Sequence, residues 1–137
     1  MNKATSALAL AAFLASCAST PTAKEVEKLG PAAIVGVWTS ELDHTVLTVC
    51  KDGTFTVVHG DATATGHWST HSAPDGAAST VEFTNDGDPC AGIAGTYTPE
   101  VVRDTVRFTK RYDDCATREE HMAWPWTRAA SGSTSGK

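Results

Sequence analysis

The chain has 137 residues, 41% of them hydrophobic, and its 16 Asp and Glu outnumber 11 Lys and Arg to give a formal net charge of −5. A chain of this length accommodates one domain. The acidic balance argues against binding to nucleic acid and against electrostatic adhesion to anionic lipid, because both depend on clusters of basic side chains.

Residues 1–16 have the layout of a secretory signal peptide. A positively charged Lys3 precedes an uncharged apolar stretch, residues 7–15, which ends in small side chains. The apolar stretch is about a dozen residues long, whereas a helix that crosses a bilayer needs about 20. We therefore expect this segment to be removed on export.

The end of this segment, Leu14-Ala15-Ser16-Cys17, resembles the lipobox of bacterial lipoproteins. The resemblance implies cleavage before Cys17, a diacylglycerol thioether on its sulfur, and attachment to the bacterial cell envelope by lipid. Ala18 follows in place of an Asp, which implies the periplasmic face of the outer membrane in a Gram-negative host. The alternative is an ordinary cleaved signal peptide with an incidental cysteine.

Composition divides the rest of the chain into three parts. Residues 17–32 combine Ser, Thr and Pro with charges of both signs, which predicts a tether after the lipidated cysteine. Residues 129–137 are rich in Ser and Gly, which predicts a mobile tail. The folded domain is therefore expected over residues 33–128.

The domain shows the two-residue hydrophobic period of β-strands. Val46–Cys50 and Phe55–His59 flank an Asp52-Gly53 turn, which is a strong hairpin signal. Further strands are expected at Ile34–Ser40, Ala64–Thr70, Thr80–Thr84, Gly95–Thr98, Thr105–Lys110 and Met122–Thr127. No stretch of ten residues with helical periodicity separates them, which excludes a parallel βαβ sheet. Short sequential hairpins favour a small eight-stranded antiparallel up-and-down barrel over a sandwich.

Gly36-Val37-Trp38 resembles the first-strand signature of the lipocalins and their calycin relatives. The resemblance implies that Trp38 plugs the closed end of the barrel, that Gly36 lets the chain bend there, and that Arg128 covers the indole ring. Segments around Cys90–Tyr97, Asp113–Arg118 and Trp126–Arg128 look like small uncharacterised bacterial lipocalin-like lipoproteins. The alternative is an unrelated β protein with one core tryptophan. The expected fold class is thus all-β, a lipocalin-like barrel after a lipoprotein signal peptide.

The cysteines suit an oxidising compartment. Cys90 and Cys115 each lie near a strand end beside turn residues, which favours a disulfide between them. Pairing of Cys50 with either one is the alternative. We expect Cys50 on its strand to be a buried small hydrophobe, and the absence of a Cys-x-x-Cys motif argues against a thiolate metal site.

No metal, cofactor or catalytic site is predicted. His67 and His71 are too far apart on one strand to share an ion, so only a barrel rim that gathered His44, His59 and His121 would build a metal site. Solvated or hydrogen-bonded histidines are the favoured interpretation. The sequence lacks the common nucleophile, zinc and phosphate motifs. We interpret residues 119–121 as the polar face of the last strand, and the protein as a non-enzyme.

Aromatic residues carry the remaining functional signal. Those expected to line a ligand site are Phe55, Trp68, Phe83, Tyr97 and Phe108. Their bulk leaves room only for a small cavity or one at the open rim. The primary hypothesis is a monomeric, membrane-anchored module that binds a small hydrophobic or amphipathic molecule. The alternative is an envelope module with a filled core that binds another protein, as periplasmic barrel inhibitors of proteases or of lysozyme do, through residues 18–30 or 70–78.

Overall fold

The computed structural model describes residues 33–72 and 79–129. Predictions for the signal peptide, Cys17, the tether at 17–32 and most of the tail lie outside the described residues. Among those described, no helix has the length and apolar character needed to cross a bilayer.

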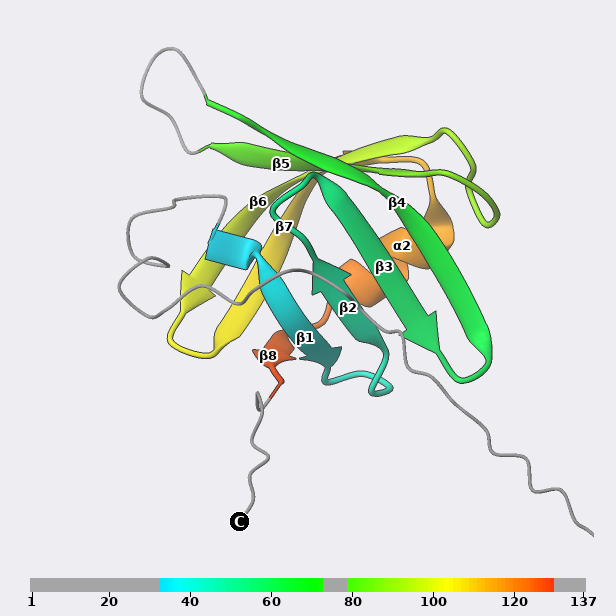
Figure 1. Ribbon diagram of the computed structural model, residues 1–137. Helices are drawn as coiled ribbons and strands as arrows, with labels where there is room; N and C mark the ends of the chain where they lie inside the picture. Colours follow the sequence, from blue (N-terminus) through cyan, green and yellow to red (C-terminus); the bar gives the residue numbers. More distant parts are fainter. Residues whose placement is uncertain (1–32, 73–78, 130–137) are drawn as a thin grey trace, which may run out of the picture.

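Eight antiparallel strands close into one barrel in simple chain order (Figure 1). The strands are β1 (Gly36–Ser40), β2 (Val46–Val49), β3 (Thr54–His59), β4 (Ala62–His71), β5 (Thr80–Asn85), β6 (Ala94–Val102), β7 (Thr105–Asp113) and β8 (Trp126–Arg128). Each pairs with its neighbours in sequence, and β1 closes the barrel by pairing with β8. The predicted eight-stranded up-and-down barrel is confirmed.

Alternating burial along the strands explains why the sheet closes. In β5 the residues alternate between half-buried and buried, so that Val81 and Phe83 point into the core. The β2–β3 connection is the expected Asp-Gly turn: Gly53 has φ 93°, and Asp52 Oδ1 accepts a hydrogen bond of 3.0 Å from the backbone N–H of Thr54. The turn residues and the two-residue burial pattern thus both favour the same antiparallel hairpins.

An aromatic cluster centred on Phe83 fills much of the interior. The Phe83 ring meets those of Phe55, Phe108 and Tyr97 edge to face, with centroid distances of 5.3, 5.9 and 6.4 Å. Such edge-to-face contacts are worth about 0.5–1.5 kcal/mol each beyond the burial of apolar area. These rings join β3, β5, β6 and β7 across the barrel interior.

Trp38 closes the end of the barrel at which β1 begins and β8 finishes. Its side chain is fully buried, and its Nε1 donates a 2.7 Å hydrogen bond to the carbonyl oxygen of Ile34. The Arg128 guanidinium carbon lies 4.2 Å from the centroid of the Trp38 ring, as the lipocalin resemblance implies. Gly36 has φ 140°, and a Cβ there would lie 2.7 Å from Arg128 Nη1. Only glycine fits comfortably beneath this cation.

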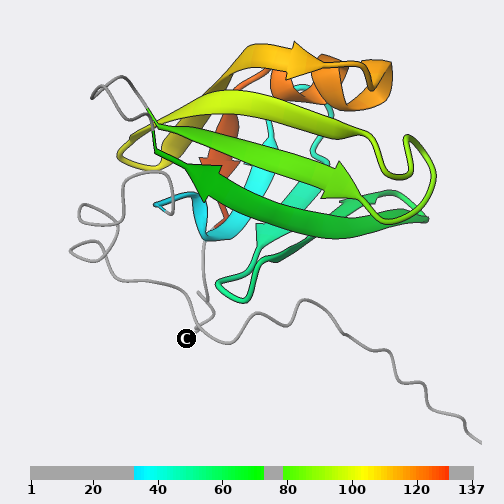
Figure 2. The same cartoon turned by 90° about the horizontal axis from the view of Figure 1, so that it is seen from above.

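A helix interrupts the predicted last strand. Residues Ala116–Met122 form α2, which packs beside β7 (Figure 2). Residues 119–121 were expected on the polar face of the last strand, which is wrong because they are helical. The strand expected over Met122–Thr127 is wrong for the residues before Trp126. β8 begins only at Trp126. Seven residues make barely two helical turns, too short for the 3.6-residue period to be distinguished.

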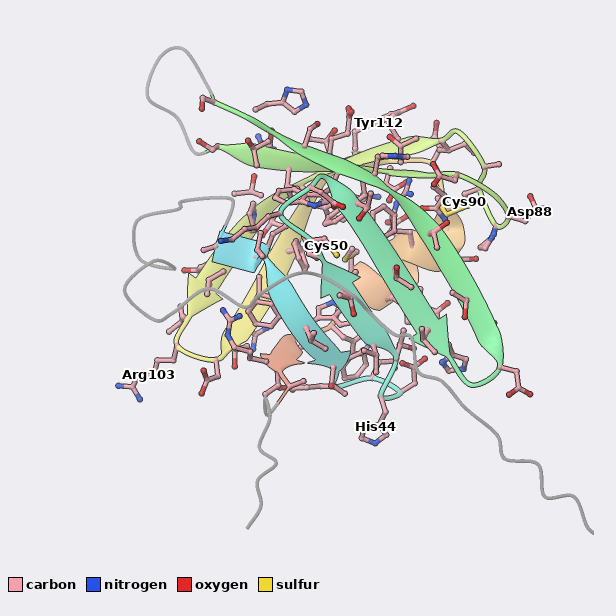
Figure 3. All side chains as sticks on the ribbon, in the orientation of Figure 1. His44, Cys50, Asp88, Cys90, Arg103 and Tyr112 are labelled. Carbon is pink, nitrogen blue, oxygen red and sulfur yellow. A yellow bond between two sulfur atoms is a disulfide. The ribbon has the colours of Figure 1, made fainter. Side chains whose placement is uncertain are left out.

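A disulfide anchors the start of this helix, because Cys90 and Cys115 are bonded with a Cα–Cα distance of 5.6 Å. This confirms the favoured pairing. Cys115 is also the N-cap of α2, and its sulfur accepts from the backbone N–H of Arg118 at 3.4 Å. Cys50 corrects another expectation: it lies after the end of β2 (Figure 3) and is half-buried rather than buried on the strand.

Candidate functional site

A cavity of about 290 Å³ lies inside the barrel at the end opposite Trp38. In an up-and-down barrel alternate connections meet at one end. Here the β1–β2 loop, the β3–β4 turn, the β5–β6 loop and α2 surround the opening. Its apolar wall comes from β2, β3, β4, β5, α2 and β8, and includes Leu47, Phe55, Val57, Ala62, Ala64, Phe83, Met122 and Trp126. Polar side chains that contribute to the lining are Thr45, His59, Asn85, Arg118 and His121.

One hydrogen-bond donor in this wall lacks a partner. Trp126 is 1% exposed, and its Nε1 finds no acceptor in the described part of the chain. An unsatisfied buried donor costs about 1–3 kcal/mol.

A buried ion pair between Arg118 and Asp113 supports the polar part of this wall. Arg118 donates to Asp113 through Nε at 2.7 Å and Nη2 at 2.8 Å, and to Asn85 Oδ1 through Nη1 at 2.8 Å. Tyr97 also donates its hydroxyl to Asp113. Burial alone would raise the pKa of Asp113, but hydrogen bonds from Arg118, Tyr97 and the Cys115 backbone outweigh it and lower that pKa.

The same network acts on Tyr97 in the opposite direction. Burial raises the pKa of Tyr97, and the hydrogen bond to the Asp113 carboxylate raises it further. The phenol therefore stays neutral and remains a donor. Because its polar groups are engaged within the protein, this network shapes the cavity and holds α2 in place.

Asp43, His59 and His121 meet at the opening of the cavity. They come from the β1–β2 loop, the end of β3 and α2, and their potential ligand atoms all lie within 4.8 Å of one another. Asp43 Oδ2 is 3.3 Å from His59 Nδ1 and 3.0 Å from His121 Nε2. Burial opposes ionisation of Asp43, but hydrogen bonds from the Thr45 side chain and backbone and from His121 prevail and lower its pKa to about 2.

Of the five aromatic residues expected to line a ligand site, two line the cavity and three do not. Phe55 and Phe83 contribute to the cavity wall. Tyr97 and Phe108 are not among the lining residues and pack within the aromatic cluster. Trp68 is half-buried outside the cavity, and its Nε1 donates to the carbonyl oxygen of Cys50 at 2.8 Å.

Sequence reasoning missed several residues of this end of the barrel. Trp126 and Met122 line the cavity because α2 redirects the chain before β8, and no local pattern announces this. The histidine cluster contains Asp43 rather than His44. His44 has φ 66° and extends away from the barrel (Figure 3). The spacing of Asp43 and Thr45 is typical of an Asx turn, which was the available signal.

No protein-family model, curated protein or solved structure matches this chain. The site offers apolar walls and, at its opening, a group of two imidazoles and a carboxylate. This combination suits a molecule with an apolar body and a small polar group.

Proposed function

We propose that this protein is a lipid-anchored module of the bacterial envelope that holds a small amphipathic molecule in the cavity beside α2. The observation that carries the proposal is the apolar cavity of about 290 Å³ with polar side chains, His59 and His121 among them, at its opening. Apolar burial supplies the affinity, and the polar side chains at the opening favour a ligand with a polar group at one end.

Cavity volume limits the ligand to a small molecule. An engineered apolar cavity of about 150 Å³ holds benzene. The volume here, about 290 Å³, is about twice as large and corresponds to a ligand of about ten to twelve non-hydrogen atoms. We therefore expect medium-chain acids, alcohols or esters to bind in the micromolar range, and longer chains to extend past the opening.

The signal-peptide and lipobox features support the envelope part of the proposal. Mass spectrometry of the protein from its bacterial host tests it directly. We expect a mature chain that begins at Cys17 with a diacylglycerol thioether on its sulfur. An unmodified cysteine, or one joined by a disulfide to Cys50, contradicts lipidation.

Ligand binding is tested on the chain from Ala18 to Lys137, after circular dichroism has established that it is folded. A hydrophobic reporter dye is titrated and then displaced by straight-chain acids and alcohols of about 6 to 14 carbons. We expect saturable one-to-one binding with an optimum at medium length. Absence of saturable binding by the folded protein refutes the proposal and favours a partner protein on the envelope.

Two variants locate the bound molecule. Ala64, which lines the cavity, is replaced by Phe to occupy it, and the exposed Ala123, which does not line the cavity, is replaced by Phe as the matched control. We expect A64F to abolish binding and A123F to leave it unchanged.

A further inference from the structure

The arrangement of hydrogen bonds around His121 identifies which of its ring nitrogens carries a proton. Nδ1 lies 3.0 Å from the carbonyl oxygen of Thr117, which only accepts, so Nδ1 is the donor. In the neutral ring the lone pair is then on Nε2, which lies 3.0 Å from Asp43 Oδ2. A lone pair that faces a carboxylate oxygen is repelled unless a cation, either a proton or a metal ion, lies between them.

The Asp43 carboxylate is held by one oxygen and presents the other. Oδ1 accepts from the Thr45 backbone N–H at 3.1 Å and from the Thr45 hydroxyl at 2.6 Å. Oδ2 faces both His59 and His121. Half of the carboxylate is thus fixed by the loop, while the other half is directed at the two imidazoles.

We propose that Asp43, His59 and His121 bind a divalent transition metal ion, with Zn²⁺ as the best match, at the opening of the cavity. Two imidazoles and one carboxylate are a common protein ligand set for zinc with an open position. Ligand atoms around a tetrahedral zinc with bonds of about 2.1 Å lie about 3.4 Å apart. The distances of 3.0 and 3.3 Å to Asp43 Oδ2 already approach this value.

The surroundings of the ligands match those of zinc sites. Zinc-bound histidines usually donate the other ring N–H to a carbonyl or carboxylate, as His121 Nδ1 does to Thr117. His59 has a side chain that is 58% exposed at a strand end, and its Nδ1 lies 2.8 Å from the Thr45 hydroxyl, a contact that it would exchange for the metal ion. Calcium and magnesium fit poorly, because they require more oxygen ligands than this group offers.

This inference does not depend on the proposed organic ligand. His59 and His121 also line the cavity, so the ion would lie at its opening, but three protein ligands hold it without any other molecule. The competing explanation is that Asp43 and His121 form only an ion pair that ties α2 to the β1–β2 loop.

The test measures Zn²⁺ binding by the full-length protein, purified without a polyhistidine tag in a non-ionic detergent. Calorimetry and competition with a chromogenic chelator should show one equivalent of Zn²⁺ per chain. Loss of residues that merely orient a ligand weakens metal binding by about 10- to 100-fold. His59→Ala and Asp43→Asn remove ligands themselves, so each should weaken binding at least as much.

Two histidine variants serve as matched controls. His67→Ala removes a second His–Asp contact of similar length, 2.9 Å to Asp86, for which residues 33–72 and 79–129 offer no third ligand. His44→Ala removes an exposed neighbour of Asp43. Neither should change the affinity for Zn²⁺, and circular dichroism should show that H59A and D43N remain folded.

Spectroscopy separates a built site from scattered surface binding. Bound Co²⁺ should give the visible absorption of a four-coordinate ion, and the ring nitrogens of His59 and His121 should shift together in NMR spectra on addition of Zn²⁺. Absence of stoichiometric binding overturns the proposal. Binding that H59A and D43N leave unchanged, or that H67A abolishes, overturns it as well.

Discussion

Replacement of Arg118 by Met tests whether the buried ion pair holds α2 and the cavity wall. Arg118 is 7% exposed at its side chain and donates four hydrogen bonds, two of them to Asp113. The Asp113 side chain is fully buried. Among the described residues, this carboxylate keeps only the Tyr97 hydroxyl and the Cys115 backbone N–H as donors in R118M.

The expected cost is about 3–5 kcal/mol, because the variant leaves one buried charge without its partner. Typical domains are stable by only about 5–15 kcal/mol. The double variant R118M/D113N removes both charges, so it should regain much of this loss. A coupling energy of several kcal/mol between Arg118 and Asp113 is therefore expected from the double-mutant cycle.

Urea denaturation of the four proteins, with the disulfide intact, measures these free energies. The pH dependence of the free energy of unfolding gives a second, independent test. In the parent protein the pKa of Asp113 is lowered from 3.8, so the stability that it contributes is present above 3.8 and is lost as the pH falls through the folded-state pKa. In R118M burial raises this pKa, so the variant should gain stability relative to the parent as the pH is lowered from about 7 to about 5.

Two results refute this reasoning. One is a cost below about 1 kcal/mol for R118M at neutral pH, and the other is a loss of relative stability on mild acidification. Either would show that Asp113 is solvated or already neutral in the folded protein.

Three further predictions concern other parts of the barrel. Gly36→Ala should destabilise the fold by more than about 1 kcal/mol, because alanine is strained at φ 140° and its Cβ would meet Arg128; thermal unfolding beside R128A shows whether the two effects are coupled. Replacement of Cys90 and Cys115 by Ser should cost about 3.5 kcal/mol on the chain-entropy model for a separation of 25 residues, and an unchanged urea midpoint would contradict this. Asp43→Asn should reduce the loss of stability on acidification. The Asp43 carboxylate, with its pKa of about 2, stabilises the folded state above pH 3.8 and loses that effect as the pH falls through 2. Unfolding curves of the variant between pH 5 and pH 2 that match those of the parent would contradict this.

Strands and closure were predictable because their causes are local. Alternating apolar residues and the Asp52-Gly53 turn specify hairpins wherever the rest of the chain lies. Sequential hairpins leave an unpaired strand at each edge of the sheet, and pairing of β1 with β8 removes both. The contact of Trp38 with Arg128 followed from a family resemblance rather than from spacing.

The helix α2 was not predictable in the same way. A helix of two turns is marginal in isolation. This one is stabilised by the disulfide at Cys115 and by the buried ion pair of Arg118, which both require the folded barrel. Its effect on the site is large, since it brings His121 and Met122 to the opening of the cavity.

The sequence by itself determined an acidic, all-β domain whose strands alternate inward and outward, because period and turn chemistry act between near neighbours. Only the tertiary structure decided which inward residues surround empty space and which groups meet at its opening. Asp43 and His121 are 78 residues apart, yet their side chains lie 3.0 Å from each other. Contacts of this kind depend on barrel closure and on the position of one short helix, which no local pattern encodes.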